Sequence, residues 1–471
     1  MERAERANGT VKGGRTLDSC SLFHVPRRFV NRRGRANVQS EFKEGEPVPP
    51  IPREKTLDST LALIRDPYRY ISNRCQHHGS DLFEARLLLR KTICMTGPEA
   101  ARLFYDSSRF SRRDAMPKAI QKTLLGVGGV QGLDDDAHRH RKQMFMSLMT
   151  PARIEELVQL TTAELRLRVR TWESLDQVVL YPELQMILMR ATCAWAGVPL
   201  ADTEVDARTR EITALFDHAG SVGFRHLWSR SARKRADRWL AQFVEQIRSG
   251  GVAPSDDSAA HIIAWHRDVN GELLAPHVAA VELLNVIRPT VAVSVYIVFV
   301  AHALHAHPQL HEKLQSNDDG YAERFVQEVR RYYPFFPAVA ARTRQRFEWN
   351  GYPFSEGQRV LLDLYGTNQD RRTWKDPEEF EPERFSQWGA SPFNFVPQGG
   401  GSHHADHRCP GEWIALELMK LATEFFTRRV TYEVPEQDLS IDWSRLPALP
   451  RSRFVIRNIR ENQRAEARRR R

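Results

Sequence analysis

The sequence predicts one large, mainly α-helical domain with a minor β part. Apolar residues recur with helical periodicity along most of the chain, whereas segments that read as strands are few and short. Between residues 55 and 460 we find no internal repeat and no second Pro-rich linker. Of the 471 residues, 41% are hydrophobic and 27% are charged, which is typical of a globular protein with a sizeable core.

The two ends of the chain differ from its middle. Residues 1–45 hold 10 Lys/Arg and 5 Asp/Glu, residues 460–471 hold 6 and 2, and together they carry +9 of the net charge of +10. A Pro-rich run at 47–52 follows the first basic segment. We expect a disordered basic leader and linker over residues 1–54, a single catalytic domain over 55–460 and a basic tail over 461–471. The near-neutral middle shows no basic face, so no nucleic-acid partner is expected.

The expected elements follow the apolar periodicity in chain order. Short strands are expected at residues 82–96, 340–349, 359–364 and 431–434. Helices are expected at residues 56–73, 97–104, 117–123, 137–148, 151–172, 181–196, 202–220, 232–249, 258–265, 276–304, 308–314, 321–333 and 412–428.

The cysteines and the apolar segments indicate a cytoplasmic protein. The five cysteines are dispersed, odd in number and free of any Cys-x-x-Cys spacing, which favours a reducing compartment: Cys20, Cys75, Cys94, Cys193 and Cys409. The first 40 residues lack the apolar core of a secretory signal, although an Arg-rich targeting segment stays open as an alternative. The most apolar stretch, 291–304, is too short to span a membrane, so we expect a core helix and no transmembrane segment.

The stretch 393–412, FNFVPQGGGSHHADHRCPGE, contains the strongest candidate site. Cys409 directly precedes an expected helix, where the positive end of the helix dipole favours a thiolate, and Arg408 acts in the same direction. Gly411 removes a side chain where something flat can approach. These features describe a thiolate that is presented to a large ligand, and haem iron is the candidate. A zinc site is the alternative reading of the neighbouring residues His403, His404, Asp406 and His407, but their spacing is too compact and a second Cys pair is absent.

A second pattern lies upstream of this loop. Glu328 and Arg331 stand three residues apart in an expected helix and therefore share a face. Arg384 follows in the sequence Pro-Glu-Arg-Phe. We expect an Arg–Glu–Arg cluster of these three side chains that braces the cysteine loop through bidentate ion pairs.

The third pattern is a charged residue in an apolar helix. Arg288 has no carboxylate three or four residues away, and a guanidinium is expensive to bury unpaired. A bound carboxylate ligand is therefore an attractive counter-ion, although a side chain that reaches solvent at a helix bend is the alternative. The following Pro289 removes an N–H, frees the carbonyl of Asn285 and bends the helix.

In this order, the motifs resemble those of the cytochrome P-450 superfamily of haem-thiolate proteins, over about residues 55–460. The longer spacing from Gln398-Gly399-Gly400-Gly401 to the cysteine is similar to that of the fatty-acid peroxygenase branch. The resemblance implies the P-450 fold, with haem b between the Arg288-Pro289 helix and the Cys409 loop, Cys409 as axial iron ligand and Gly411 at the cofactor.

The resemblance also implies the chemistry. Arg288-Pro289 replaces the acid–alcohol pair of most relatives, so hydrogen peroxide is expected as oxidant, without flavin, NAD(P)H or a redox partner. A long-chain fatty acid is then hydroxylated at its α or β carbon, with decarboxylation as a side reaction, and its carboxylate on Arg288 serves as general acid–base. Two alternatives stay open: a reductase-dependent monooxygenase of another substrate, and a non-catalytic haem or fatty-acid binding protein.

The run from Gln131 to Lys142 carries further candidates. From the residues alone, Asp134–Asp136 form either a metal site or an N-terminal cap for the helix that follows, and we prefer the cap. The resemblance implies that His138 and Lys142 donate to a haem propionate, that Gln131 faces the distal pocket, and that Arg342 is a further propionate partner. The aromatic segment 334–337 lines an apolar channel or packs in the core.

Overall fold

The computed structural model describes residues 50–221, 223–316, 320–389 and 391–462. The predicted leader (1–54) and tail (461–471) lie almost wholly outside these residues. Within residues 50–54, Ile51 is buried and Arg53 pairs with Glu84 in an isolated β-bridge. The last described residues of the presumed linker are therefore packed on the domain.

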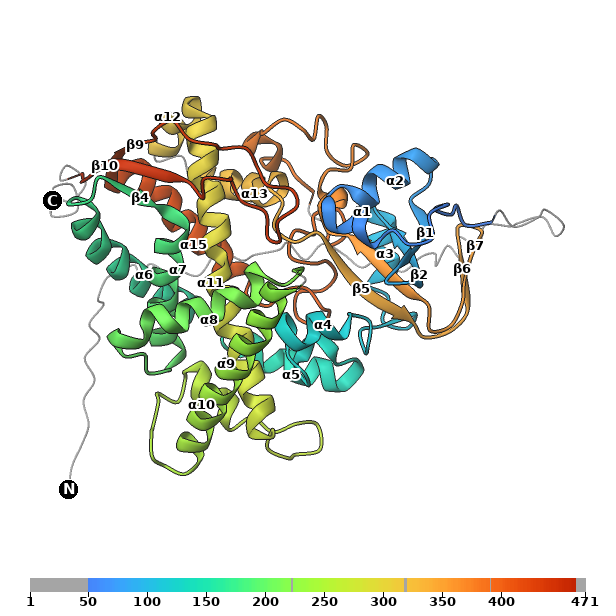
Figure 1. Ribbon diagram of the computed structural model, residues 1–471, viewed down its shortest axis with the longest axis horizontal. Coiled ribbons are helices and arrows are strands. Elements are labelled where there is room, and N and C mark those ends of the chain that lie inside the picture. Colours follow the sequence, from blue (N-terminus) through green and yellow to red (C-terminus); the bar gives the residue numbers. More distant parts are fainter. Residues whose placement is uncertain (1–49, 222, 317–319, 390, 463–471) are drawn as a thin grey trace, which may run out of the picture. The chain divides into compact units, whose positions relative to one another are not determined.

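Helices dominate the described chain, and the predicted fold class, mainly α with a minor β part, is confirmed (Figure 1). Six further turns are 3₁₀- or π-helical: η1 (Gln121–Leu125), η2 (Val130–Gly132), η3 (Asp202–Glu204), η4 (Pro308–Leu310), η5 (Pro382–Phe385) and η6 (Phe425–Arg429). The α-helices are α1 (Thr60–Arg65), α2 (Tyr70–His78), α3 (Pro98–Phe104), α4 (Lys118–Ile120), α5 (Asp135–Ser147), α6 (Pro151–Trp172), α7 (Leu180–Ala196), α8 (Val205–Asp217), α9 (Phe224–Arg248), α10 (Ala259–Ala264), α11 (Pro276–Ala306), α12 (His311–Gln315), α13 (Tyr321–Tyr332), α14 (Leu364–Asn368) and α15 (Glu412–Glu424).

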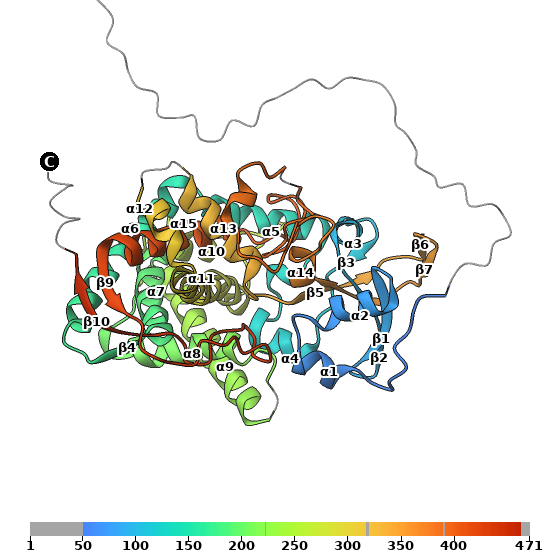
Figure 2. The same cartoon turned by 90° about the horizontal axis from the view of Figure 1, so that it is seen from above.

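The strands form three small sheets. The largest has the order β1 (Leu82–Leu87), β2 (Arg90–Met95), β8 (Arg359–Asp363), β5 (Ala338–Thr343) and β3 (Phe110–Ser111), and only its β2–β8 pair is parallel. A second sheet joins β4 (Gln177–Val179), β10 (Val455–Glu461) and β9 (Val430–Glu433), and β6 (Phe347–Trp349) pairs with β7 (Tyr352–Phe354). Figures 1 and 2 show the five-stranded sheet set apart from the main group of helices.

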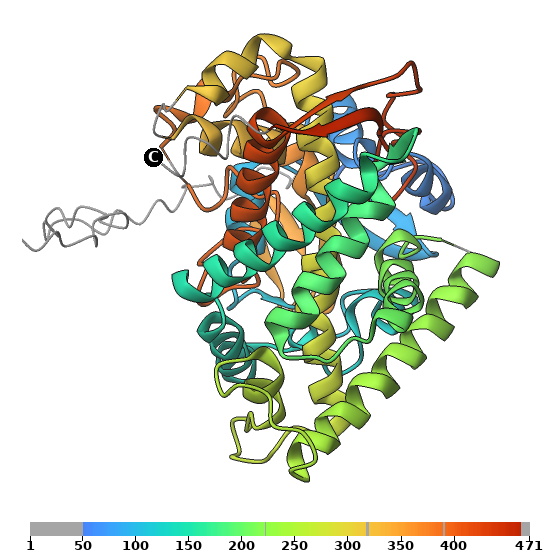
Figure 3. The same ribbon diagram turned by 90° about the vertical axis from the view of Figure 1, so that its left-hand side faces the viewer.

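Helix α11 is the centre of the core. It has 31 residues, and its apolar side chains are buried all round, as expected for a helix without a solvent face. It packs against α7, α9 and α15, and Figure 3 shows α11 (yellow) running through the helical part with α15 (red) beside it. Among the described residues it is the one helix long and apolar enough to cross a membrane, but 94% of its most apolar window is buried within the fold. It is therefore a core helix, as its predicted range (276–304) indicated.

Several predicted elements are divided or shifted. The strand expected over 82–96 is the hairpin β1–β2, whose turn residues Leu88 and Leu89 have φ of 53° and 59°. Neither is the Gly or Asn that normally marks such a turn, so the sequence carried no signal for it. The helix expected over 56–73 is two helices, because the chain turns at Asp66-Pro67. Helix α9 begins at Phe224, before the predicted start at 232, and strands β4 and β10 were missed.

Candidate active site

Cys409 lies on the loop that leads into α15. Its backbone N–H donates to the carbonyl of Gln398 at 3.0 Å, which closes the loop on itself. The glycines permit this closure: Gly399 and Gly401 have φ of 95° and 82°, and a Cβ on Gly400 would lie 2.7 Å from the carbonyl oxygen of Pro392. The glycine triplet therefore shapes the loop that holds the thiol at the start of the helix.

The charge environment of Cys409 corrects one expectation. Burial raises the pKa of this thiol and the carboxylate of Glu412 adds to the effect, whereas Lys142, the N–H of Gly411 and Arg330 only oppose it. The guanidinium of Arg408 acts on the thiol in the predicted direction, but it is paired with Glu412 (Nε–Oε2 2.6 Å, Nη2–Oε1 3.1 Å), whose carboxylate acts in the opposite direction. The prediction that the protein alone favours the thiolate was wrong, since desolvation outweighs the helix dipole. A metal ion would deprotonate such a thiol directly.

Glu412 joins this loop to helix α13. It is buried, and the guanidiniums of Arg330 and Arg408 hold the pKa of its carboxyl at about 2 although burial opposes them. Arg330 is 1% exposed, forms an ion pair with Glu412 and donates to Oε1 of Gln398 at 2.9 Å. One guanidinium thus fixes both ends of the cysteine loop. Sequence reasoning missed Arg330, although its place beside Arg331 in an amphipathic helix could have drawn attention to it.

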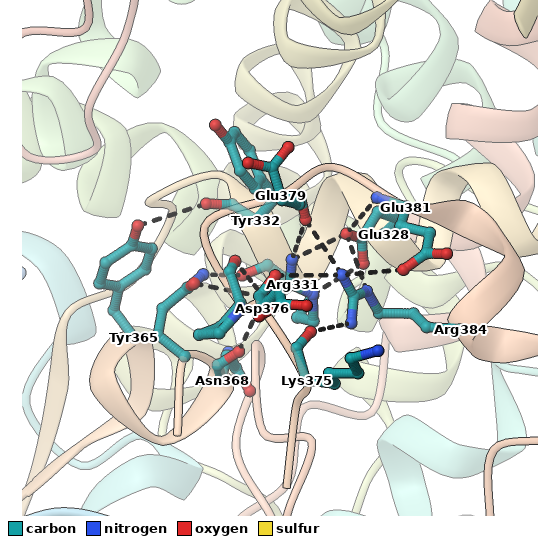
Figure 4. Close-up of polar contacts among 12 residues, drawn as sticks. Glu328, Arg331, Tyr332, Tyr365, Asn368, Lys375, Asp376, Glu379, Glu381 and Arg384 are labelled. Carbon is teal, nitrogen blue, oxygen red and sulfur yellow. Dashed lines mark hydrogen bonds and ion pairs between the residues drawn. The ribbon is translucent and has the colours of Figure 1, made fainter. Parts of the chain in front are cut away.

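The structure brings together Glu328, Arg331 and Arg384, as the sequence predicted (Figure 4). Arg331 donates to Glu328 through Nε–Oε2 and Nη2–Oε1, both at 2.7 Å, and Arg384 Nε lies 3.2 Å from Glu328 Oε1. Arg331 also donates to the backbone carbonyls of Pro377 and Glu379, at 2.9 and 3.1 Å. The cluster therefore ties α13 to the irregular segment that precedes the cysteine loop.

Arg288 lies in the middle of α11, 6% exposed. This burial excludes the alternative in which its side chain reaches solvent. Nη1 donates to the carbonyl of Leu124 and Nη2 to Oδ1 of Asn285, at 3.2 Å for the latter. Among the described residues, no carboxylate lies within ion-pair distance of this guanidinium.

Burial and the repulsion of the nearby Arg233 lower the pKa of Arg288 to about 9, and a charged Cys409 opposes them. Pro289, next to Arg288, is partly exposed, whereas the residues on either side of it in the helix are buried. A buried guanidinium in this state attracts an anion.

A polar network supports Arg288, and sequence reasoning missed it. Asn285 Nδ2 donates to Glu282 Oε2 at 2.9 Å and to Gln131 Oε1 at 3.2 Å, while its Oδ1 accepts from Arg288. Glu282 is fully buried and paired with Arg141 Nη1 at 2.6 Å. The predicted Gln131 is therefore linked to Arg288 through Asn285. Glu282 is the only acid in α11, so the argument that singled out Arg288 would also have found it.

Lys142 and His138, on consecutive turns of α5, lie against the cysteine loop. Lys142 is 2% exposed and its Nζ donates to the carbonyls of Asp406 (3.0 Å) and Arg408. The ring of His138 stacks on His407 with 3.8 Å between centroids, and burial lowers the pKa of His138 to about 4. The structure thus places both predicted donors beside the loop; their contact with a propionate stays a prediction.

Arg342 lies on strand β5 and donates to the carbonyls of Asp114 and Gly357, both at 2.9 Å. The structure therefore shows no contact between Arg342 and the cysteine loop. Arg112, which sequence reasoning missed, lies closer to it: this cation lowers the pKa of both His138 and His407.

The aspartate run lies where the sequence predicted, at the start of α5. Asp134 is the N-cap residue, and Asp135 and Asp136 stand in the first turn, where their charges complement the helix dipole. The side chain of Asp134 accepts from the Ser111 hydroxyl and the Arg112 N–H (2.8 Å) and not from its own helix, and Asp135 pairs with Arg344. In the described parts of the chain, no group of three or more His, Cys, Asp or Glu is placed to hold a metal ion. The zinc reading of the 403–407 histidines therefore has no support.

The residues at this loop fit a haem group. A single cysteine sulfur on a loop facing α11 matches the axial ligand of haem-thiolate proteins. A Cβ on Gly411 would meet no atom within 4 Å, so the helix start is open to a flat ligand. Lys142, His138 and Arg112 place cationic or N–H donors beside the same loop, where carboxylate groups could accept from them.

Comparison with known proteins supports this interpretation. The family model for cytochrome P450 matches residues 306–450. Taxane 10-beta-hydroxylase of Taxus cuspidata is 20% identical over 443 residues, which cover 85% of this chain and 87% of the relative. The solved structure of cytochrome P450SP alpha (CYP152B1) in complex with (R)-ibuprofen is 58% identical, with a TM-score of 0.84, over 86% of this chain and 99% of that one. This chain belongs to the cytochrome P450 family.

Two further structures place this P450 in the CYP152 group. Cytochrome P450EX alpha (CYP152N1) with myristic acid is 46% identical, and a variant of the P450 OleT in complex with arachidonic acid is 34% identical. Each has a TM-score of 0.85 and matches 88% of this chain and 99% of its own. The predicted resemblance to the cytochrome P-450 superfamily and to its fatty-acid peroxygenase branch, which these CYP152 structures represent, is confirmed.

Proposed function

We propose that this P450 hydroxylates long-chain fatty acids at the α or β carbon, with hydrogen peroxide as the oxidant. The observation that carries the proposal is Arg288, a guanidinium that is 6% exposed and has no carboxylate partner among the described residues. A carboxylate substrate is the counter-ion that this site lacks. The CYP152 structures with myristic acid and arachidonic acid add support by analogy.

The guanidinium of Arg288 has N–H groups that can still bind such a carboxylate. Of its five N–H groups, those that contact Leu124 and Asn285 hold the fork in place, and the others remain for a carboxylate. Arg233 is also buried and donates to the Leu124 carbonyl, but its charge is paired with Asp237 (Nε–Oδ1 2.8 Å), so Arg288 is the cation of this pair that lacks a carboxylate. An ion pair formed in this apolar region is stronger than one in water.

We infer haem b as the cofactor, held by Cys409, with Lys142, His138 and Gly411 in contact with it and Arg342 as a further propionate partner. The bound haem supplies the oxidation: RH and H₂O₂ become ROH and H₂O. The substrate carboxylate on Arg288 takes a proton from one peroxide oxygen and returns it to the oxygen that leaves as water. Because Arg288 fixes carbon 1, carbons 2 and 3 are the nearest to the reaction centre, which accounts for α or β hydroxylation.

The composition of α11 favours peroxide over dioxygen. Its only acid, Glu282, is engaged by Arg141, and the hydroxyl of Thr290 donates to the carbonyl of Val286 at 2.8 Å. Pro289 stands between Arg288 and Thr290 and leaves the Asn285 carbonyl without its helical N–H. None of these groups is free to pass protons to dioxygen, so no flavin, NAD(P)H or redox partner is required. Gln131, hydrogen-bonded to Asn285, supports the amide that orients Arg288.

The test uses the haem-loaded protein with one saturated fatty acid. With hydrogen peroxide alone we expect hydroxy acids, and with NADPH and a reductase but no peroxide we expect none. The reverse result would establish the alternative, a reductase-dependent monooxygenase. A red-shifted Soret band of the reduced carbon monoxide complex, without turnover under either condition, would instead establish a haem or fatty-acid binding protein.

We place the enzyme in the cytoplasm, supported by four described cysteines that are all free.

A further inference from the structure

The β1–β2 turn exposes two leucines in a conformation that leucine disfavours. Leu88 and Leu89 have φ of 53° and 59° and are 54% and 71% exposed. Left-handed backbone at two successive non-glycine residues stores strain. Two bonds from the neighbouring segment hold the turn: the N–H of Leu88 donates to Oγ1 of Thr60 at 2.6 Å, and that of Leu89 to Oδ2 of Asp58 at 2.5 Å. The turn therefore keeps two exposed leucines, although Asn-Gly would adopt the same backbone conformation with less strain.

The segment that holds the turn is itself apolar on its outer side. Leu57, Leu61 and Ile64 are 73%, 68% and 41% exposed, and the short helix α1 buries none of its residues. Together with the turn they form one apolar patch, because Thr60 and Asp58 join the two segments directly. A contiguous exposed patch of this kind marks an interaction surface.

Four cations beside the apolar patch have no ion-pair partner among the described residues. Arg86 and Lys91 stand directly opposite each other in the antiparallel β1–β2 register, and both are exposed. Like charges in that position repel and destabilise the hairpin. Neither they nor Arg65 and Arg90 form an ion pair with any residue in the described part of the chain. The carboxylate of Asp58 lies at the same surface and accepts from the backbone N–H groups of Thr60 (2.8 Å) and Leu89 (2.5 Å).

We propose that α1 and the β1–β2 turn dock this enzyme on an anionic lipid surface. Leucines on a convex turn can enter the boundary between headgroups and acyl chains while the flanking cations contact lipid phosphates. Lipid phosphates would then neutralise the cross-strand pair Arg86 and Lys91, which has no ion-pair partner among the described residues.

A second exposed apolar region, at the start of α9, supports a lipid bilayer as the partner. Phe224 and Leu227, in the first turn of α9, are 83% and 62% exposed, and Arg225 between them is exposed as well. In Figure 2, α1, the β1–β2 pair and α9 all lie along the lower edge of the folded unit, and in Figure 1 they lie on the near face. Because both exposed apolar regions lie on one side of the domain, they can contact the plane of a bilayer at the same time. A long-chain fatty acid would be taken up from the same surface, a consequence that rests on the proposed function.

The test measures binding of the full-length holoenzyme to extruded vesicles of phosphatidylcholine with 30% phosphatidylglycerol (about a third anionic lipid). The variant Leu88→Asn/Leu89→Gly supplies the relaxed turn pair, so we expect a higher melting temperature together with vesicle binding at least about ten-fold weaker. Leu167→Ser, which removes an equally exposed leucine (57%) from α6, is the matched control and should bind like the wild type.

The charge contribution is tested separately. Arg86→Gln/Lys91→Gln should weaken binding about five-fold for each cation and make it less dependent on salt, and pure phosphatidylcholine vesicles should bind the wild type poorly. Unchanged binding of the turn variant would overturn the proposal, as would absence of wild-type binding. Self-association that the turn variant abolishes, without any vesicle binding, would assign the face to contacts between copies of this chain. Peroxide turnover in detergent-free solution reports on the proposed function independently of either outcome.

Discussion

Arg288 and Asn285 lie three residues apart on α11, and the guanidinium Nη2 donates to Oδ1 of the amide at 3.2 Å. The same amide donates to Glu282 and to Gln131. A neutral acceptor therefore orients the arginine without neutralising it. The buried charge is held ready for a carboxylate that the protein itself does not provide.

Asn285→Asp tests this relationship with an almost isosteric change. The new carboxylate pairs with Arg288 and competes with the substrate, so we expect fatty-acid affinity to fall at least about ten-fold while haem content is kept. Titration of the Soret band with a fatty acid measures the affinity. Asn285→Ala, which leaves Arg288 charged, serves as comparison and should retain more affinity than Asn285→Asp. Equal fatty-acid binding by wild type and Asn285→Asp would contradict the role given to the neutral amide.

Glu282→Gln leaves the buried Arg141 without its ion-pair partner. We expect a loss of about 3–5 kcal/mol in the free energy of unfolding, because an unpaired charge remains in the core. Urea denaturation followed by circular dichroism measures it. The double variant Glu282→Gln/Arg141→Met removes both charges and should recover most of the lost stability. A double variant no more stable than Glu282→Gln would show that the loss does not come from an unpaired charge on Arg141.

Arg331→Met removes the centre of the Glu328 cluster and should also cost about 3–5 kcal/mol, with lower haem retention because the segment before the cysteine loop is released. The control is Arg371→Met, which removes an ion pair whose side chains are 75% and 63% exposed and should change stability by less than about 1 kcal/mol. Similar effects of the two substitutions on unfolding and on the haem-to-protein ratio would refute the bracing role.

Asp363 predicts a pH dependence of stability. Burial raises the pKa of its carboxyl from 3.8 to about 7, so between these values the folded state keeps a proton that the unfolded state releases. Below about pH 4 the carboxyl is protonated in both states, and its ionisation does not lower the free energy of unfolding. As the pH rises towards 7 the unfolded state ionises first, so the free energy of unfolding falls. Asp363→Asn keeps an acceptor for the N–H of Gly366, which Oδ1 contacts at 2.7 Å, but cannot ionise.

We therefore expect Asp363→Asn to match the wild type at pH 4 and to exceed it at pH 8. Urea midpoints measured across that range provide the check. A wild-type advantage that grows with pH would show that the ionised carboxylate is stabilised in the fold.

What the sequence could predict depended on local pattern. The range of α11 was predictable because its apolar run is continuous, and Arg288 was conspicuous because it interrupts that run. The Glu328–Arg331 pair follows from helical spacing. The contacts of Asn285 and Arg330 were not predictable in this way, because their partners Gln131 and Glu412 lie 154 and 82 residues away along the chain.

The errors and omissions have a common physical cause. Cys409 was expected to be acidic from its place before a helix, but its burial could not be known from neighbours in sequence. Asp134 is the N-cap residue as predicted, but its side-chain partners Ser111 and Arg112 approach from another segment and could not be known from its neighbours in sequence. The turn at Leu88–Leu89 carried no glycine or asparagine, so its conformation followed only from the bonds with Asp58 and Thr60.

The central claim is that the substrate's own carboxylate, held by Arg288, carries out the proton transfer that peroxide requires. The most direct measurement compares peroxide-driven product formation by the wild-type holoenzyme from one saturated fatty acid and from its methyl ester. We predict hydroxy acids from the free acid and no product from the ester, which has the same chain but no carboxylate. Equal rates with the two substrates would contradict the account.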